Sequence, residues 1–181
     1  MSFSRSKPQE TPYAGPQWWQ AAIVLAIAVL AQVEIMPHLA FRHAVPSAVL
    51  VAVVWYALRT DARRAALFGL IAGACEDLLG GSLTGVGTGG AWTLATTATA
   101  LLVSSLSQRF FADSIPVVAT AVAIATLFQR LLFWTVMSLE GYPRGYAQVH
   151  LHEALWEALL NVVLAAVLML GARLLENRRT R

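Results

Sequence analysis

Most of the chain consists of long apolar runs without charge, separated by short polar or basic turns. A helix that crosses a bilayer needs about 20 predominantly apolar residues. The pattern predicts six such helices, in residues 11–33, 44–58, 65–79, 89–108, 114–139 and 150–175. Six helices of this kind need about 120 residues, which a chain of 181 residues supplies together with short loops. The expected fold class is therefore an all-α integral membrane protein, a bundle of six transmembrane helices.

Helix breakers set several of these boundaries. Pro46 is expected in the first turn of the second helix, where proline is well tolerated. Residues 78–108 carry no charge, but six glycines interrupt the first part of this run, so the fourth helix is expected to begin near Gly89. The first helix is too long for the apolar part of a cleavable signal peptide, and a poor cleavage site follows it. It is therefore expected to stay in the protein as a span.

The bundle is expected to be the only folded domain, since the sequence shows neither an internal repeat nor a second domain. Residues 1–16 are polar and contain three prolines, which predicts a short disordered tail. Residues 17–176 would form the membrane domain, and residues 177–181 a short basic tail.

Loop charges predict on which side of the membrane the two tails lie. One set of alternate loops holds Arg42 and Arg144, and the other set holds ten basic residues: Arg5, Lys7, Arg59, Arg63, Arg64, Arg109, Arg173, Arg178, Arg179 and Arg181. Basic residues gather in cytoplasmic loops, so both termini are expected in the cytoplasm. Composition agrees with a membrane protein, because 57% of the residues are apolar and only 13% are charged, against about 25% in globular proteins. These values argue against a soluble enzyme, a disordered chain and a protein that binds nucleic acid.

Charged side chains inside the expected helices are the candidates for function, because a charge in lipid is costly and tends to face the bundle interior or water. At about 1.5 Å per residue, the charged residues of helices one, three, five and six lie about 18–24 Å from the inner surface. We therefore expect a polar layer around Arg130 in the outer half of the bundle, with a wet cavity that opens outward. Its expected members are Glu34, Glu76, Asp77, Arg130, Glu157 and Asn161. Asp77 is the first expected partner of Arg130 and Glu157 the second, and structural ion pairing and a functional site both stay open as roles.

Small residues recur every four positions on the third helix, at Ala65, Gly69 and Gly73. This spacing places them on one face of the helix. Small residues let a second helix approach closely in lipid. The stripe is therefore either a packing face inside the bundle or a docking face for another protein.

Groups that could carry chemistry are sparse. The single Cys75 excludes an internal disulfide and is expected to be a buried, inert thiol. His150, His152 and Glu153 suggest a metal site, but the two histidines would point in different directions on a helix, so no metal is expected. The glycine-rich residues 85–90 lack the strand and the downstream acid of a dinucleotide loop, so no cofactor is expected. Catalytic motifs are not visible either, and a non-enzymatic role is expected.

One segment carries a more specific pattern. Pro46 at the second helix and a basic turn at residues 59–64 precede residues 69–85, which read Gly-Leu-Ile-Ala-Gly-Ala-Cys-Glu-Asp-Leu-Leu-Gly-Gly-Ser-Leu-Thr-Gly. This arrangement resembles the rod shape-determining protein MreD family, whose pattern is a Gly-Leu-x-x-Asp-Leu-Leu core followed by a small-residue turn and Leu-Gly. The present chain departs from it with Ala-Cys-Glu before Asp77 and with Thr84 between the leucine and the glycine. The last helix, with Ala-Leu-Leu-Asn ending at Asn161, also resembles the last helix of the family.

The resemblance implies a non-enzymatic scaffold in the inner membrane of bacteria, within the machinery of cell elongation and peptidoglycan synthesis. Family members partner the bitopic protein MreC, in a complex that connects MreB filaments with the glycosyltransferase RodA and its class B penicillin-binding transpeptidase. MreC is therefore the expected partner, with RodA and the transpeptidase as further candidates and a homo-oligomer as an open alternative. The family's bundle is also similar to substrate-binding subunits of energy-coupling-factor transporters. The alternative function is accordingly the substrate-binding membrane subunit of a vitamin-type transporter.

Overall fold

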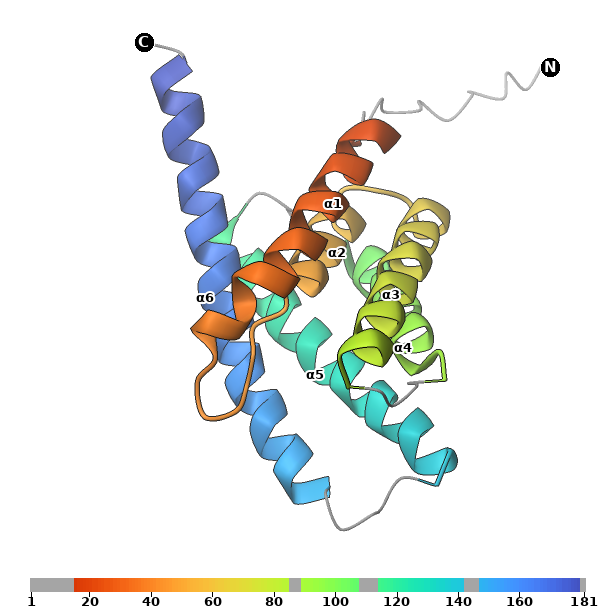
Figure 1. Ribbon diagram of the computed structural model, residues 1–181. Helices are drawn as coiled ribbons and strands as arrows, with labels where there is room; N and C mark the ends of the chain where they lie inside the picture. Colours follow the sequence, from red (N-terminus) through yellow and green to blue (C-terminus); the bar gives the residue numbers. More distant parts are fainter. Residues whose placement is uncertain (1–14, 85–88, 108–113, 142–146, 180–181) are drawn as a thin grey trace, which may run out of the picture.

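The computed structural model describes residues 15–84, 89–107, 114–141 and 147–179, and within them it is all-helical. Its elements are α1 (Trp18–Glu34), η1 (Met36–Leu39), α2 (Ala48–Ala57), α3 (Ala62–Thr84), α4 (Ala91–Ser107), α5 (Ile115–Leu139) and α6 (Ala147–Arg179) (Figure 1). An isolated bridge between Phe41 and Ala44 closes a tight turn after η1. The expected all-α class is therefore confirmed.

Helix α2 lies at the centre of the bundle. Its ten residues are apolar on all sides, as is typical of a buried helix, and Val49, Leu50, Val53 and Val54 are fully buried. It packs against α1, α3, α4, α5 and α6. Ten residues extend only about 15 Å, half of the roughly 30 Å hydrocarbon core. By itself α2 is therefore too short for the full span expected of residues 44–58.

The start of α2 also differs from the expectation. Pro46 lies outside the helix, immediately before the N-cap Ser47, and not in the first turn. The Ser47 hydroxyl accepts a hydrogen bond from the backbone N–H of Leu50 at 3.0 Å. A serine side chain satisfies a free N–H group of the first turn, which proline cannot do, so Ser47 sets the boundary.

Glycine interrupts the chain later than the sequence suggested. Helix α3 continues through Gly80 and Gly81 to Thr84, because a glycine inside a helix costs only about 1 kcal/mol. Gly89 and Gly90 have φ angles of +56° and +85°, a left-handed conformation that glycine adopts without strain. Helix α4 begins only after this pair, at Ala91. Residues 85–88 of the glycine-rich segment lie outside the described part of the chain.

The helices form two antiparallel pairs around α2. Helix α3 packs along α4, and α5 packs along α6 (Figure 1). The start of α1 and the end of α6 lie at the same end of the bundle in Figure 1. Helix α6 has 33 residues and runs past the expected end at residue 175. Its length of about 50 Å exceeds the thickness of a hydrocarbon core.

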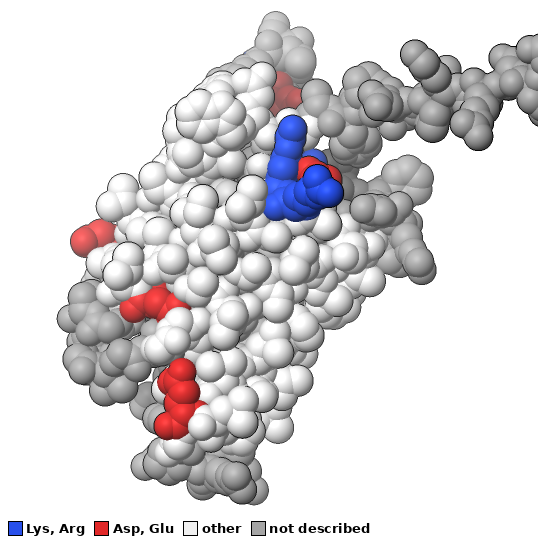
Figure 2. Space-filling view, turned by 90° about the vertical axis from the view of Figure 1, so that its right-hand side faces the viewer, with Lys and Arg blue, Asp and Glu red and all other residues white. Residues whose placement is uncertain are grey.

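The surface is suited to a membrane. Helix α5 and residues Val149–Arg178 of α6 are long and apolar enough to cross a bilayer, while α1, α2 and α4 are shorter apolar helices. Large apolar side chains stay exposed on the outside of the bundle, among them Ile27, Leu78 and Leu131. Uncharged residues cover most of the face in Figure 2, and its basic residues gather near one end. Such a wide apolar surface fits contact with lipid. The number of spans and their orientation stay predictions.

Candidate functional site

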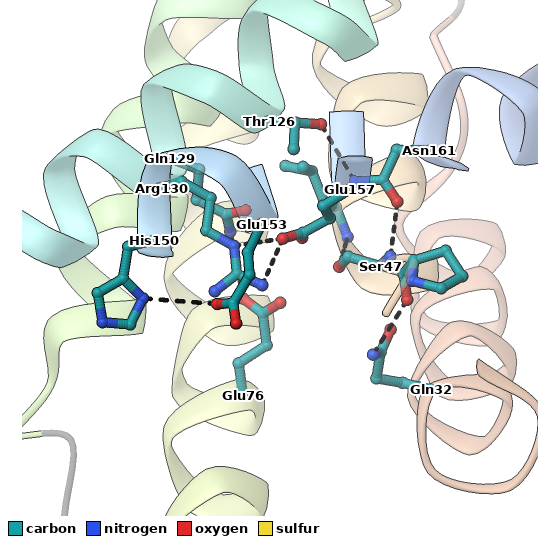
Figure 3. Close-up of polar contacts among 12 residues, drawn as sticks. Gln32, Ser47, Glu76, Thr126, Gln129, Arg130, His150, Glu153, Glu157 and Asn161 are labelled. Carbon is teal, nitrogen blue, oxygen red and sulfur yellow. Dashed lines mark hydrogen bonds and ion pairs between the residues drawn. The ribbon is translucent and has the colours of Figure 1, made fainter. Parts of the chain in front are cut away.

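Several polar side chains meet inside the bundle near the starts of α2 and α4 (Figure 3). Thr96, Gln129, Glu157 and Asn161 are buried there. A buried polar group is costly unless it forms hydrogen bonds, so the partners of each side chain show what holds the layer together.

An ion pair joins α5 to α6. Arg130 donates from Nε to the carboxylate of Glu157, and its Nη2 approaches the same oxygen. The Glu157 side chain is only 2% exposed, whereas Arg130 is 30% exposed. The guanidinium carbon of Arg130 lies 5.0 Å from the ring centroid of Trp92, and that ring stacks on Phe133 at 4.1 Å. Arg130 thus bridges α6 and α4 through one ion pair and one cation–π contact.

Asp77 accepts hydrogen bonds from the first turn of α4. Its carboxylate accepts hydrogen bonds from the backbone N–H of Trp92 at 3.1 Å, from the N–H of Thr93 at 2.8 Å and from the Thr93 hydroxyl at 2.5 Å. The first N–H groups of a helix lack partners within the helix. A negative charge is also favourable at that end of the helix dipole. Asp77 is therefore an N-cap that one helix supplies to the next. Of the two partners expected for Arg130, the ion pair is with Glu157.

Glu76, the neighbour of Asp77 in sequence, forms a separate set of contacts. It accepts a hydrogen bond from the hydroxyl of Thr96 at 2.8 Å. Gln129 donates from Nε2 to Thr96 Oγ1 at 2.6 Å, and the same nitrogen lies 3.5 Å from Glu76. The other amide atom, Gln129 Oε1, is buried without a hydrogen-bond partner among the described residues. This chain of contacts connects α3, α4 and α5.

The start of α2 is capped from outside as well. Asn161 accepts a hydrogen bond at Oδ1 from the backbone N–H of Ser47 at 2.6 Å, and it donates from Nδ2 to the hydroxyl of Thr126 at 3.1 Å. Gln32 of α1 accepts from the backbone N–H of Ala48 at 2.8 Å. Helices α1 and α6 thus hold the first turn of α2.

These contacts share one physical purpose. Helix ends that are buried away from water need hydrogen-bond partners from the protein. Asp77, Gln32 and Asn161 supply such partners to α4 and α2. These hydrogen bonds can fix the positions of the helices relative to one another.

Sequence reasoning named some of the residues that form these contacts and missed others. Glu76, Asp77, Arg130, Glu157 and Asn161 all contribute contacts near this end of the bundle, whereas Glu34 is exposed at the last residue of α1, apart from these contacts. The residues missed are Gln32, Ser47, Trp92, Thr93, Thr96, Thr126 and Gln129. The signal for Gln129 was its place directly before Arg130 in an otherwise apolar run, whereas serine and threonine are too common in membrane helices to stand out.

The other candidate groups lie apart from one another. His150 Nδ1 is 3.6 Å from the carboxylate of Glu153, and His152 accepts a hydrogen bond from the indole of Trp156 at 3.0 Å. The described residues contain no group of three or more metal-binding side chains. Cys75 is a partly buried free thiol.

The stripe on α3 faces α4 inside the bundle. Ala65 is fully buried. A Cβ atom on Gly69 would lie 2.9 Å from the carbonyl oxygen of Thr96, and one on Gly73 would lie 2.6 Å from Cα of Thr93. Both positions are closer than real Cβ atoms come to backbone, so the glycines permit the close contact between α3 and α4.

Comparison with known proteins identifies the family of this chain. Neither a curated protein sequence nor a solved structure matches the chain. A sequence model of the rod shape-determining protein MreD family matches residues 16–178, nearly the whole chain. The match includes the bundle, the α3 stripe and every member of the polar layer. The chain therefore belongs to the MreD family of rod shape-determining proteins.

Proposed function

We propose that this protein is a non-enzymatic scaffold of the elongation complex in the bacterial inner membrane, where it binds MreC. RodA and its class B transpeptidase are the further partners that this assembly would contain. Membership in a family that determines rod shape supports the general role. The partner and the scaffold mechanism are the proposal.

The observation that carries the proposal is how the interior polar groups are used. Asp77 and Asn161 are hydrogen-bonded to the starts of neighbouring helices, and Arg130 is ion-paired with Glu157. These contacts stabilise one arrangement of helices, which suits a protein that presents a fixed surface to others. A catalytic group would instead need access to a substrate.

The proposal includes six spans with both termini in the cytoplasm. The ten-to-two distribution of loop charges supports this orientation. The length and apolar character of α5 and α6 support membrane insertion. Helix α2, too short to cross alone, is surrounded by the other helices, where a short helix is tolerated because protein and not lipid contacts its ends.

Copurification tests the proposal directly. The tagged full chain is expected to retain MreC through extraction in a mild detergent. A membrane protein of similar length from another family serves as the control. Purification without MreC, from cells that contain it and grow as rods, would contradict the scaffold. Retention of an ATPase module together with a vitamin-sized ligand would instead favour the transporter alternative.

A further inference from the structure

An apolar groove of about 620 Å³ runs along the side of the bundle between α1, α2 and α6. Small side chains form its floor, including Ala28, Ala52 and Ala165, and larger apolar side chains such as Ile27 and Leu168 form its walls. Of its charged lining residues, Arg59 lies just after α2, and Arg173 and Glu176 belong to the last part of α6. The groove is therefore apolar along its length and polar at one end.

The length of the groove corresponds to one leaflet of a bilayer. Its lining runs from Ala48 along α2 to Arg59 just after it, and from Leu164 to Glu176 along α6. At about 1.5 Å per residue these stretches extend roughly 17–18 Å, close to half of a hydrocarbon core of about 30 Å. The arginine end is the end predicted to face the cytoplasm, so the groove lies in the inner leaflet.

Its size distinguishes between two kinds of occupant. A spanning helix about 30 Å long extends well beyond the roughly 17–18 Å length of the groove and into the other leaflet. An acyl chain of one leaflet is as long as the groove and narrow enough to lie within it. The dimensions favour a lipid chain over a partner helix.

The charges at the end of the groove favour an anionic headgroup. Arg59 is held there by the last turn of α2, since its Nη1 donates to the carbonyl oxygen of Trp55 at 3.1 Å and its guanidinium carbon lies 5.5 Å from the Trp55 ring centroid. A guanidinium has five N–H groups, so it can contact a phosphate as well as the partners it has within the protein. Arg59 and Arg173 each carry one positive charge and Glu176 one negative charge, which leaves a net charge of +1. The cytoplasmic leaflet is rich in anionic lipids, whereas the basic flank of a partner helix would be repelled.

We propose that the groove between α1, α2 and α6 binds an anionic phospholipid of the cytoplasmic leaflet. One acyl chain lies against the alanine floor, and the phosphate contacts Arg59 and Arg173. The site depends on membrane insertion but not on MreC. Lipid retention is measured on the chain alone, so a failure to bind MreC would not contradict the lipid site.

Native mass spectrometry of the full chain in mild detergent tests the site with two probes, phosphatidylglycerol and phosphatidylcholine. The wild type is expected to retain phosphatidylglycerol in preference. The pair Arg59→Gln and Arg173→Gln should lower that retention by about fivefold per arginine. The control pair Arg63→Gln and Arg178→Gln removes the same charge from exposed side chains outside the groove and should behave as the wild type. An equal loss in both pairs, or no preference in the wild type, would overturn the site.

Two further measurements address the groove itself and its occupant. Ala31→Trp fills the groove without a change of charge and should displace both lipids; undiminished retention in this variant contradicts the proposal. A photo-crosslinking amino acid at the exposed Ala172 keeps the folded chain intact and reports the occupant in native membranes. Capture of a phospholipid supports the site, whereas capture of another protein's helix in its place overturns it.

Discussion

Asn161 on α6 accepts a hydrogen bond from the backbone N–H of Ser47, 114 positions away at the start of α2. The distance between Oδ1 and the nitrogen is 2.6 Å. Helices in water are usually capped by a side chain next to them in sequence. Here side chains of other helices complete the caps of α2 and α4. Each cap therefore also fixes one helix relative to another.

Loss of the Asn161 cap should destabilise the whole bundle. Asn161→Leu leaves the N–H of Ser47 and the hydroxyl of Thr126 without this partner. A buried donor without a partner costs about 1–3 kcal/mol. Thermal unfolding in detergent should show a loss of that size, while Leu159→Ala, at an exposed position on the same helix, should stay within about 0.5 kcal/mol of the wild type. Equal stability of Asn161→Leu and the wild type would show that the cap is dispensable.

The Asp77 cap predicts a local effect at α4. Asp77→Leu removes the acceptor for the N–H groups of Trp92 and Thr93, and loss of an N-cap costs about 1 kcal/mol. Hydrogen exchange at these two amides should accelerate, because the first turn of α4 loosens. Asp77→Asn keeps one acceptor oxygen and is expected to give a smaller change. Unaltered exchange in both variants would argue that α4 needs no cap from α3.

Substitution by alanine should have opposite effects on stability at two glycines, Gly73 in the close contact between α3 and α4 and Gly171 on α6. In Gly73→Ala the added Cβ meets the backbone of Thr93, so the helices must separate at a cost of about 1–3 kcal/mol. In Gly171→Ala the Cβ meets nothing within 4 Å, and the better helix propensity of alanine should stabilise by about 0.5–1 kcal/mol. Thermal unfolding of the two variants measures both signs. A stabilising Gly73→Ala would contradict the packing of the stripe.

The fold was predictable where it follows from local patterns. Apolar runs predicted the helices. The four-residue spacing of Ala65, Gly69 and Gly73 predicted that they share one face, but not whether this face packs inside the bundle or docks another protein. Depth estimates placed Arg130 and Glu157 at one level, and in the structure these two residues form an ion pair. Depth could not select between Asp77 and Glu157 as the partner, because helices at one level can lie on opposite sides of the bundle.

The caps were not predictable from single residues. Whether Asp77 pairs with an arginine or caps a helix depends on where α4 begins, and this boundary is set by left-handed turns at Gly89 and Gly90. The short length of α2 was hidden for a similar reason. An apolar run such as residues 44–58 does not reveal that the helix begins only after Ser47, because this start depends on partners from α1 and α6.

The charge distribution predicts the orientation of the chain in the membrane. Reporter fusions after Arg63 and after Arg144 should report opposite sides, with the first in the cytoplasm. Fusions after Arg178 should agree with those after Arg63 and serve as an internal control. Reporters after Arg63 and Arg144 on one side would refute the six-span arrangement.

The Arg130–Glu157 pair allows structural and functional roles to be separated. Arg130→Met leaves the carboxylate of Glu157 buried without its cation, a loss expected to cost about 3–5 kcal/mol. Combining it with Glu157→Gln removes the stranded charge and should restore much of the stability in a thermal double-mutant cycle. The parallel cycle with Asp77→Asn should be additive within about 0.5 kcal/mol, because Asp77 is bonded to α4. Coupling with Asp77 and none with Glu157 would contradict the observed pairing. If the restored double variant also supports rod shape, the charges serve only the bundle; if it is stable but rod shape is lost, the pair has a role beyond holding α5 against α6.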